Sequence, residues 1–147
     1  MRLNKLMAAL LILVALAPVV KAGQHYGDIA GAVYVRNYDG DTITVDLPGI
    51  HPLFGDDITV RISGIDTPEV KGKCDQERLL AHNAQALVKA RLAVAKTILL
   101  AEVGRDKYFR INARVVADGA DLGALLISRG LAVAYDGGTK THNWCAQ

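Results

Sequence analysis

Apolar and polar side chains alternate along the first half of the chain with the period of two that is typical of β-strands. Residues 58–65 place three β-branched apolar side chains on one face and polar side chains on the other. Two earlier stretches, 29–38 and 42–47, flank an Asp-Gly-Asp turn at 39–41, which is a strong hairpin signal. The proline- and glycine-rich stretch 46–57 is expected to form a long turn. The pattern therefore predicts three strands.

Helical spacing replaces this alternation after Cys74. Asp75 is expected to cap the helix, and polar side chains then recur at steps of four, three and four. The polar stripe comprises Arg78, His82, Gln85 and Lys89, and the opposite face carries Leu80, Ala84, Leu87 and Val88. The spacing predicts one amphipathic helix that covers a sheet or the end of a barrel.

The second half of the chain returns to strand character at 97–103 and 108–117, followed by an Asp-Gly turn. Residues 121–128 read as a short helix that ends at Gly130. The order is three strands, a helix, two strands and a helix. We therefore expect an α+β, mainly β fold, a five-stranded OB-type barrel with two helices packed on it. That architecture binds nucleic acids and sugars alike, so the fold alone decides nothing about catalysis.

The first residues have the three-part layout of a secretory signal peptide. Arg2 and Lys5 precede an apolar run at 6–20, and short side chains follow near residue 22. The run is 15 residues long, whereas a membrane-spanning helix needs roughly 20. We expect cleavage of residues 1–22, which leaves a secreted or periplasmic domain at 23–147 without stable membrane association. An uncleaved membrane anchor is the alternative.

Removal of this leader changes the charge of the protein. The 17 basic residues include Arg2, Lys5 and Lys21, so the mature chain would carry 14 basic and 15 acidic residues. A protein that only coats nucleic acid is expected to be strongly basic. Binding of phosphate would therefore depend on a local arrangement of charges, together with a bound cation.

The chain has two cysteines, Cys74 and Cys145. In an oxidising compartment, two thiols in a small domain are most simply interpreted as one disulfide. Such a bond would pin the short tail of the chain beside the first helix. A metal site is disfavoured because neither cysteine has a second cysteine at ligand spacing.

Three segments carry candidate chemistry: Asp-Gly-Asp-Thr at 39–42, Arg-Ile-Ser-Gly-Ile-Asp-Thr-Pro-Glu at 61–69, and Asp-Lys-Tyr-Phe-Arg at 106–110. Each alone is compatible with an ordinary charged turn. In the second segment, Pro68 favours extended geometry at Thr67. The Thr67 carbonyl and the Asp66 carboxylate can then face one point, and such oxygen ligands suit a hard cation such as Ca²⁺.

Together, in this order, the three segments resemble the staphylococcal nuclease family, and the resemblance extends from Ile29 to Tyr135. It implies one bound Ca²⁺, phosphate-binding arginines and a carboxylate that orients or deprotonates the attacking water. The implied metal ligands are Asp41, Asp66 and the Thr67 carbonyl, the arginines are Arg61 and Arg110, and the carboxylate is Glu69. The resemblance also places Asp39 near the metal, and Tyr108 and Tyr135 in the nucleotide pocket.

The chain departs from the family pattern at three places. Phe109 stands where the family usually has glycine, so the turn that presents Arg110 is expected to have a different shape. The stretch 46–57 is longer than the typical hairpin, and the chain ends soon after Tyr135.

The resemblance implies a calcium-dependent nuclease that cleaves DNA and RNA, preferably single-stranded, with low sequence specificity, leaves 3′-phosphate ends and acts as a monomer. Two alternatives remain at this stage. One is a catalytically inactive OB-fold domain that binds nucleic acid, and the other is a secreted structural module. A pure binder would not need acidic residues such as Asp41 and Glu69, which repel phosphate unless a cation is present.

Overall fold

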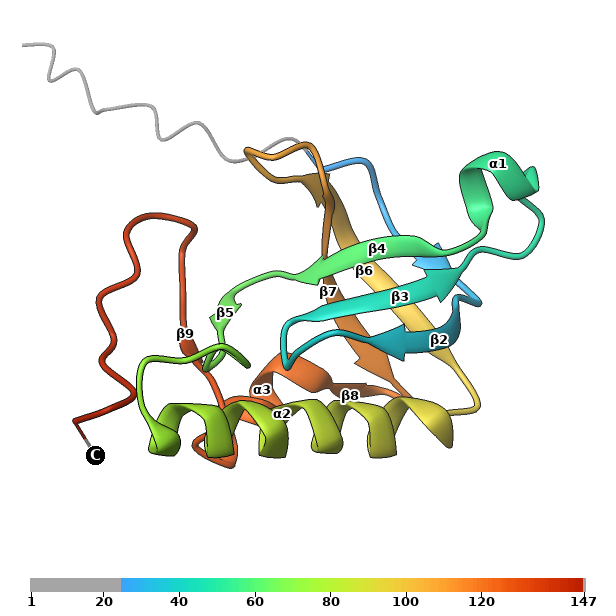
Figure 1. The fold of residues 1–147 in the computed structure, drawn as a ribbon. Coiled ribbons are helices and arrows are strands. Elements are labelled where there is room, and N and C mark those ends of the chain that lie inside the picture. Colours follow the sequence, from blue (N-terminus) through green and yellow to red (C-terminus); the bar gives the residue numbers. More distant parts are fainter. Residues whose placement is uncertain (1–24, 147) are drawn as a thin grey trace, which may run out of the picture.

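The computed structural model describes residues 25–146, so the predicted signal peptide at 1–22 lies outside the described residues. The elements of the described part follow in chain order (Figure 1). They are β1 (Ile29–Ala30), β2 (Val33–Asn37), β3 (Thr42–Asp46), α1 (Pro52–Gly55), β4 (Ile58–Ile62), β5 (Ile65–Asp66), α2 (Asp75–Ala93), β6 (Ile98–Arg105), β7 (Ile111–Ala117), β8 (Ala120–Asp121), α3 (Leu122–Ser128) and β9 (Val133–Ala134).

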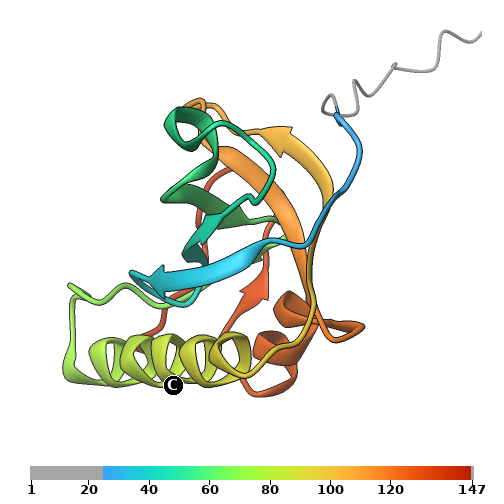
Figure 2. The same ribbon diagram turned by 90° about the vertical axis from the view of Figure 1, so that its right-hand side faces the viewer.

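The main sheet has the strand order β1-β6-β7-β4-β3-β2, with β8 beside β7. β4 and β7 pair in parallel, and the other neighbours pair antiparallel. β1 and β2 are two pieces of the predicted strand 29–38, separated at Gly31, where φ is 77°. They pair at opposite ends of the sheet order, so the sheet must curl until its ends approach each other (Figure 2). This confirms the predicted OB-type α+β arrangement.

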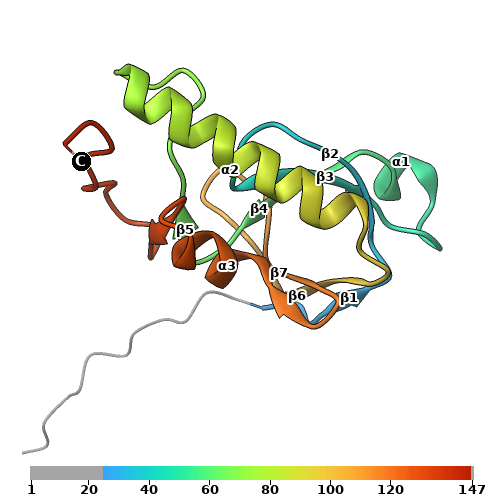
Figure 3. The same ribbon diagram turned by 90° about the horizontal axis from the view of Figure 1, so that it is seen from below.

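Helix α2 lies across one end of the curled sheet, with α3 beside it (Figure 3). The predicted amphipathic helix is confirmed, but its N-cap is Cys74 and not Asp75. The Cys74 sulfur accepts the N–H of Glu77 at 3.4 Å. The second predicted helix is also confirmed, because Asp121 caps α3 and Gly130 follows it with a φ of 66°.

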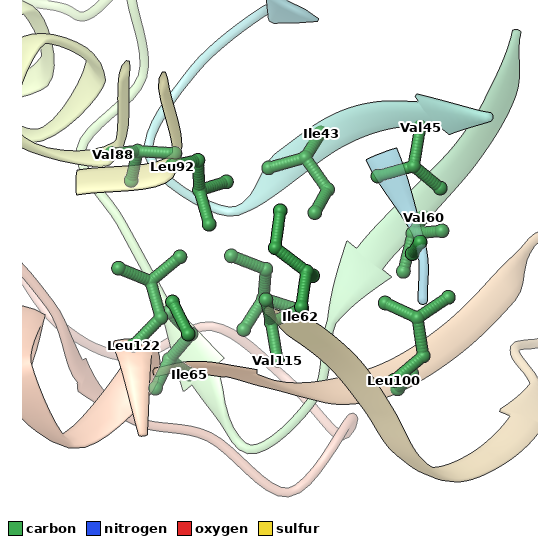
Figure 4. Close-up of a cluster of buried hydrophobic side chains, with 14 of the residues drawn as sticks. Ile43, Val45, Val60, Ile62, Ile65, Val88, Leu92, Leu100, Val115 and Leu122 are labelled. Carbon is green, nitrogen blue, oxygen red and sulfur yellow. The ribbon is translucent and has the colours of Figure 1, made fainter. Parts of the chain in front are cut away.

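The core lies between the inner face of the sheet and the two helices (Figure 4). Val60 and Ile62 of β4 are buried, as the alternation of that strand predicts. They pack against side chains from other strands and from helices α2 and α3. The labelled neighbours are Ile43, Val45, Ile65, Val88, Leu92, Leu100, Val115 and Leu122. This packing fixes the strand ends that carry the charged residues described below.

The stretch 46–57 is not only a turn, because it contains the short helix α1. The Nδ1 atom of His51 accepts the N–H of Leu53 at 3.2 Å, and Pro52 occupies the first helical position, where its missing N–H costs nothing. Gly55 closes the loop where a Cβ would lie 2.9 Å from the Cβ of Ile50. The expectation of an irregular turn was therefore wrong over Pro52–Gly55.

The predicted disulfide between Cys74 and Cys145 is present. It joins the start of α2 to the end of the chain, and Trp144 beside it is 5% exposed. The C-terminal residues therefore return to the helix, as expected. Among residues 25–146, none of the helices has the length and apolar character needed to cross a bilayer.

Candidate active site

A cleft of about 850 Å³ lies beside β4, between the β6–β7 hairpin and the C-terminal segment. It brings together residues that are separated by up to about a hundred positions in sequence. Seven of the predicted site residues line it: Asp39, Asp41, Arg61, Glu69, Tyr108, Arg110 and Tyr135. The other two, Asp66 and Thr67, are buried, and Asp66 lines an adjacent pocket that shares Tyr135 and Lys140 with this cleft.

The turn between β2 and β3 presents two of the acidic residues. A Cβ at Gly40 would lie 2.7 Å from the Cβ of Ala84, so only glycine allows the turn to pack this closely against α2. The N–H of Asp41 donates to Oδ1 of Asp39 at 3.1 Å. Asp39 therefore orients the Asp41 backbone, consistent with its predicted place as the outer acidic residue.

Asp41 is 5% exposed and pairs with Arg61. The Nη2 atom of Arg61 lies 3.0 Å from Oδ2 of Asp41. The same guanidinium donates to the backbone carbonyls of Ile62 and Ile65, so its position is fixed from two further directions. Burial raises the pKa of Asp41 to about 6, although the positive charge of Arg61 opposes the shift. An added cation would therefore stabilise the Asp41 carboxylate.

Asp66 and Thr67 converge on Asp41 from the end of β5. The N–H of Thr67 donates to Oδ2 of Asp41 at 3.2 Å. Asp66 is 4% exposed, and its Oδ1 is buried without a hydrogen bond of good geometry. The structure thus places the two predicted metal carboxylates on one side of the cleft. The metal-binding role of the Thr67 carbonyl stays a prediction.

Glu69 lies at the mouth of the cleft, where about half of its side chain is exposed. A residue that sequence reasoning missed, Lys140, contacts it. The Nζ atom of Lys140 lies 2.7 Å from Oε1 of Glu69 and 2.7 Å from Oδ1 of Asp66. Burial opposes the charge of Lys140, but the two carboxylates outweigh it and raise the pKa of this lysine. Lys140 belongs to no motif, so the sequence held no signal for it.

The tip of the β6–β7 hairpin presents Arg110 to the other side of the cleft. The Oδ2 atom of Asp106 accepts from Nε of Arg110 at 2.7 Å, and Oδ1 accepts the N–H groups of Tyr108 and Arg110. Burial favours the neutral form of Asp106, but the hydrogen bonds from Arg110 and Tyr108 outweigh it and lower the pKa. Asp106 therefore positions Arg110, a role that the sequence analysis did not assign to it.

Phe109 occupies the hairpin position where a glycine was expected. Its φ is 68°, in the left-handed region that glycine favours. The backbone therefore adopts a glycine-like conformation in spite of the side chain, and Arg110 still reaches the cleft. The guanidinium of Arg105 lies 4.6 Å from the centre of the exposed Phe109 ring.

The tyrosines occupy opposite walls of the cleft. Tyr108 is mostly exposed, and the cations of Lys107 and Arg110 lie about 5.5 Å from its ring. The hydroxyl of Tyr135 donates to the carbonyl of Gly138 at 2.6 Å. Both tyrosines line the cleft, and their role in binding a nucleotide stays a prediction.

The donor set fits a hard divalent cation. Asp41 and Asp66 offer buried carboxylate oxygens, and Oδ1 of Asp66 already has a cation beside it, the Nζ atom of Lys140 at 2.7 Å. A second group of possible ligands, Cys74, Glu77 and Cys145, does not form a metal site, because its two sulfur atoms are bonded to each other. Soft-metal chemistry is therefore disfavoured at this second group.

Comparison with known proteins agrees with the fold and with the motifs. A protein-family model described as staphylococcal nuclease homologue matches residues 59–144, which is more than half of the chain. This range includes Arg61, Asp66, Glu69 and Arg110, and it ends one residue before Cys145. Among curated proteins, none matches the chain. The match shows that this chain belongs to the staphylococcal nuclease family.

Proposed function

We propose that this protein is an exported, calcium-dependent nuclease that hydrolyses the phosphodiester bonds of DNA and RNA. Its family has a nuclease-type fold. One observation supports the proposal most strongly: the buried carboxylates of Asp41 and Asp66 both lie beside Arg61, next to a cleft that also holds a second arginine and the accessible Glu69. A domain that only bound nucleic acid would gain nothing from the three acidic side chains Asp41, Asp66 and Glu69 at this position.

Asp41, Asp66 and the carbonyl of Thr67 would hold one Ca²⁺ ion. When bound, this ion would neutralise the charge of the substrate phosphate and polarise one of its oxygens. The protein holds the Asp41 carboxylate in place before any metal binds, because the Thr67 N–H and the Arg61 guanidinium both contact it.

Arg61 and Arg110 would bind the oxygens of the phosphate on which negative charge accumulates. Two guanidinium groups from different elements hold this charge more strongly in the transition state than in the ground state. Asp106 supports this role, since it fixes Nε of Arg110 at 2.7 Å. Loss of either arginine is expected to cost about 3 kcal/mol of transition-state stabilisation, a factor of about 100 in rate.

Glu69 would orient the attacking water and accept its proton. The carboxylate is exposed to solvent at the mouth of the cleft, whereas Asp41 and Asp66 are buried. The water oxygen would bond to phosphorus while the bond from phosphorus to the 5′ oxygen breaks. The departing 5′ oxygen would take a proton from solvent, which leaves a 3′-phosphate and a 5′-hydroxyl. Glu69 is the one of the three carboxylates that can reach bulk water for this step.

The aromatic side chains that line the cleft would favour binding of single-stranded nucleic acid without strong sequence preference. Tyr108 and Tyr135 offer aromatic faces, and stacking on such faces tolerates any base. We further propose that the mature protein, after loss of residues 1–22, acts as a monomer in the periplasm or outside the cell.

The test is hydrolysis of end-labelled single-stranded and duplex DNA and RNA by the purified protein, with millimolar Ca²⁺ or with a chelator. Glu69→Gln and Arg110→Lys should each lower kcat about 100-fold or more. Arg91→Lys is the matched control, because neither Arg91 nor its partner Asp118 lines the cleft. Its rate should equal that of the unchanged protein. Tight DNA binding without cleavage would contradict the proposal and indicate an inactive binding domain.

A further inference from the structure

The C-terminal segment (residues 136–145) lines one side of the cleft and is held at both ends. Before it, β9 pairs with β5, and the N–H of Tyr135 donates to the carbonyl of Gly64 at 2.9 Å. At its far end, the Cys74–Cys145 disulfide and the buried Trp144 fix it against α2. In Figure 1 it forms the red loop beside β5 and the start of α2. Its position is therefore set by the fold and by the disulfide.

This segment delivers one cation to the acidic side of the site. The Nζ atom of Lys140 bridges Asp66 and Glu69 at 2.7 Å from each. It is the nearer of the two cations around Asp66, since Nη2 of Arg61 lies 4.0 Å from the same oxygen. The buried Oδ1 of Asp66 thus has a positive charge beside it but no hydrogen bond of good geometry.

The two cations differ in how easily they can leave. Arg61 donates to two backbone carbonyls and pairs with Asp41, so its displacement would break three interactions inside the protein. Lys140 has a flexible stem, and its side chain is about half exposed. Water can solvate its ammonium when it moves away. Lys140 is therefore the displaceable cation of the pair.

We propose that Lys140 is a built-in competitor for the divalent cation at Asp66, and that the Cys74–Cys145 disulfide holds it there. The inference rests on the calcium site of the proposed function and deepens it. An ammonium and a divalent cation repel each other strongly at contact distance, so they cannot share one buried carboxylate oxygen. Lys140 must leave Asp66 before the metal binds, and this requirement weakens the affinity of the site.

The competition predicts a specific change in calcium affinity. Lys140→Met keeps the length of the side chain but removes the charge, so Ca²⁺ should bind about tenfold more tightly, or about 1.4 kcal/mol. Lys140→Arg retains the charge and should keep the weak affinity. Lys71→Met is the matched control, because it removes the same charge from the exposed loop that follows Glu69. Its affinity should stay within about twofold of that of the unchanged protein.

The measurement is isothermal titration of CaCl₂ into chelator-treated protein without substrate, after circular dichroism has shown that each variant is folded. Equal or weaker calcium binding in Lys140→Met than in the unchanged protein would overturn the competition, while the metal site itself would stand. Absence of calcium binding in every variant would overturn both the proposed metal site and the proposed competition by Lys140.

A second measurement tests the role of the disulfide. Cys145→Ser releases one end of the C-terminal segment, so Lys140 should spend less time at Asp66 and calcium affinity should rise severalfold. In the double variant with Lys140→Met, the serine should add no further increase, because the competitor is already gone. A severalfold increase that persists in the double variant would show that the disulfide acts on the site without Lys140.

Discussion

The Cys74–Cys145 disulfide closes a large loop, and its removal gives the most quantitative prediction for stability. The two cysteines are 71 positions apart. On the chain-entropy model, opening a loop of this length raises the conformational entropy of the unfolded chain by about 15 cal/mol/K. This lowers the free energy of unfolding by about 4 kcal/mol at 25 °C. The double variant Cys74→Ser/Cys145→Ser isolates this effect, because serine at position 74 can still cap α2.

The assay is urea unfolding, followed by the fluorescence of Trp144, the single tryptophan of the chain, and by circular dichroism. With a slope of about 2 kcal/mol/M for a domain of this size, the midpoint should fall by about 2 M. Reductant should lower the midpoint of the unchanged protein by a similar amount and leave that of the variant unchanged. A loss of less than about 1 kcal/mol would refute the reasoning, since the tail would then be held by packing alone.

Substitutions at three further positions test local features of the site. Gly40→Ala should lower the free energy of unfolding by about 1–3 kcal/mol in thermal or urea unfolding, because its Cβ would clash with Ala84 and Thr67. Asp106 has a lowered pKa in the folded protein, so its contribution to stability is present above its unfolded pKa of about 4 and is lost as the pH falls through the folded value. Asp106→Asn should therefore be destabilising at pH 7 and should flatten the acid side of a plot of unfolding free energy against pH. Phe109→Gly should be more stable than Phe109→Ala by about 1 kcal/mol in urea unfolding, because alanine keeps the cost of the left-handed backbone.

The fold was predictable where local pattern and tertiary packing agree. The alternation at 58–65 corresponds to the buried face of β4, and the Asp-Gly-Asp turn corresponds to the β2–β3 hairpin. The sequence also predicted a strand at 29–38 before that turn, but it did not predict that this strand is interrupted at Gly31. That break depends on pairing with β6, a strand far away in the sequence.

Features that depend on distant contacts could not be predicted. Helix α1 is one short turn, and its stability comes from the His51 cap and from the close packing of Gly55. The cap at Cys74 was missed because a sulfur atom is a weak acceptor and Asp75 is the more usual capping residue.

The candidate site likewise contains residues that the sequence predicted and one that it did not. Asp41, Asp66 and Arg61 lie in motifs that resemble those of the family, and this resemblance was enough to group them. Lys140 lies in a tail without regular structure, and the disulfide brings it to Glu69 from 71 positions away. Its place at the acidic residues follows only from the three-dimensional path of the chain.

We propose above that the cleft hydrolyses nucleic acid with a bound calcium ion. The most direct measurement is the rate of cleavage of a labelled single-stranded oligonucleotide by the purified protein, first with chelator and then with excess CaCl₂. If this proposal is correct, cleavage should be negligible with chelator and rapid after calcium is restored, with 3′-phosphate ends on the products. Equal rates under the two conditions, or no cleavage under either, would contradict it.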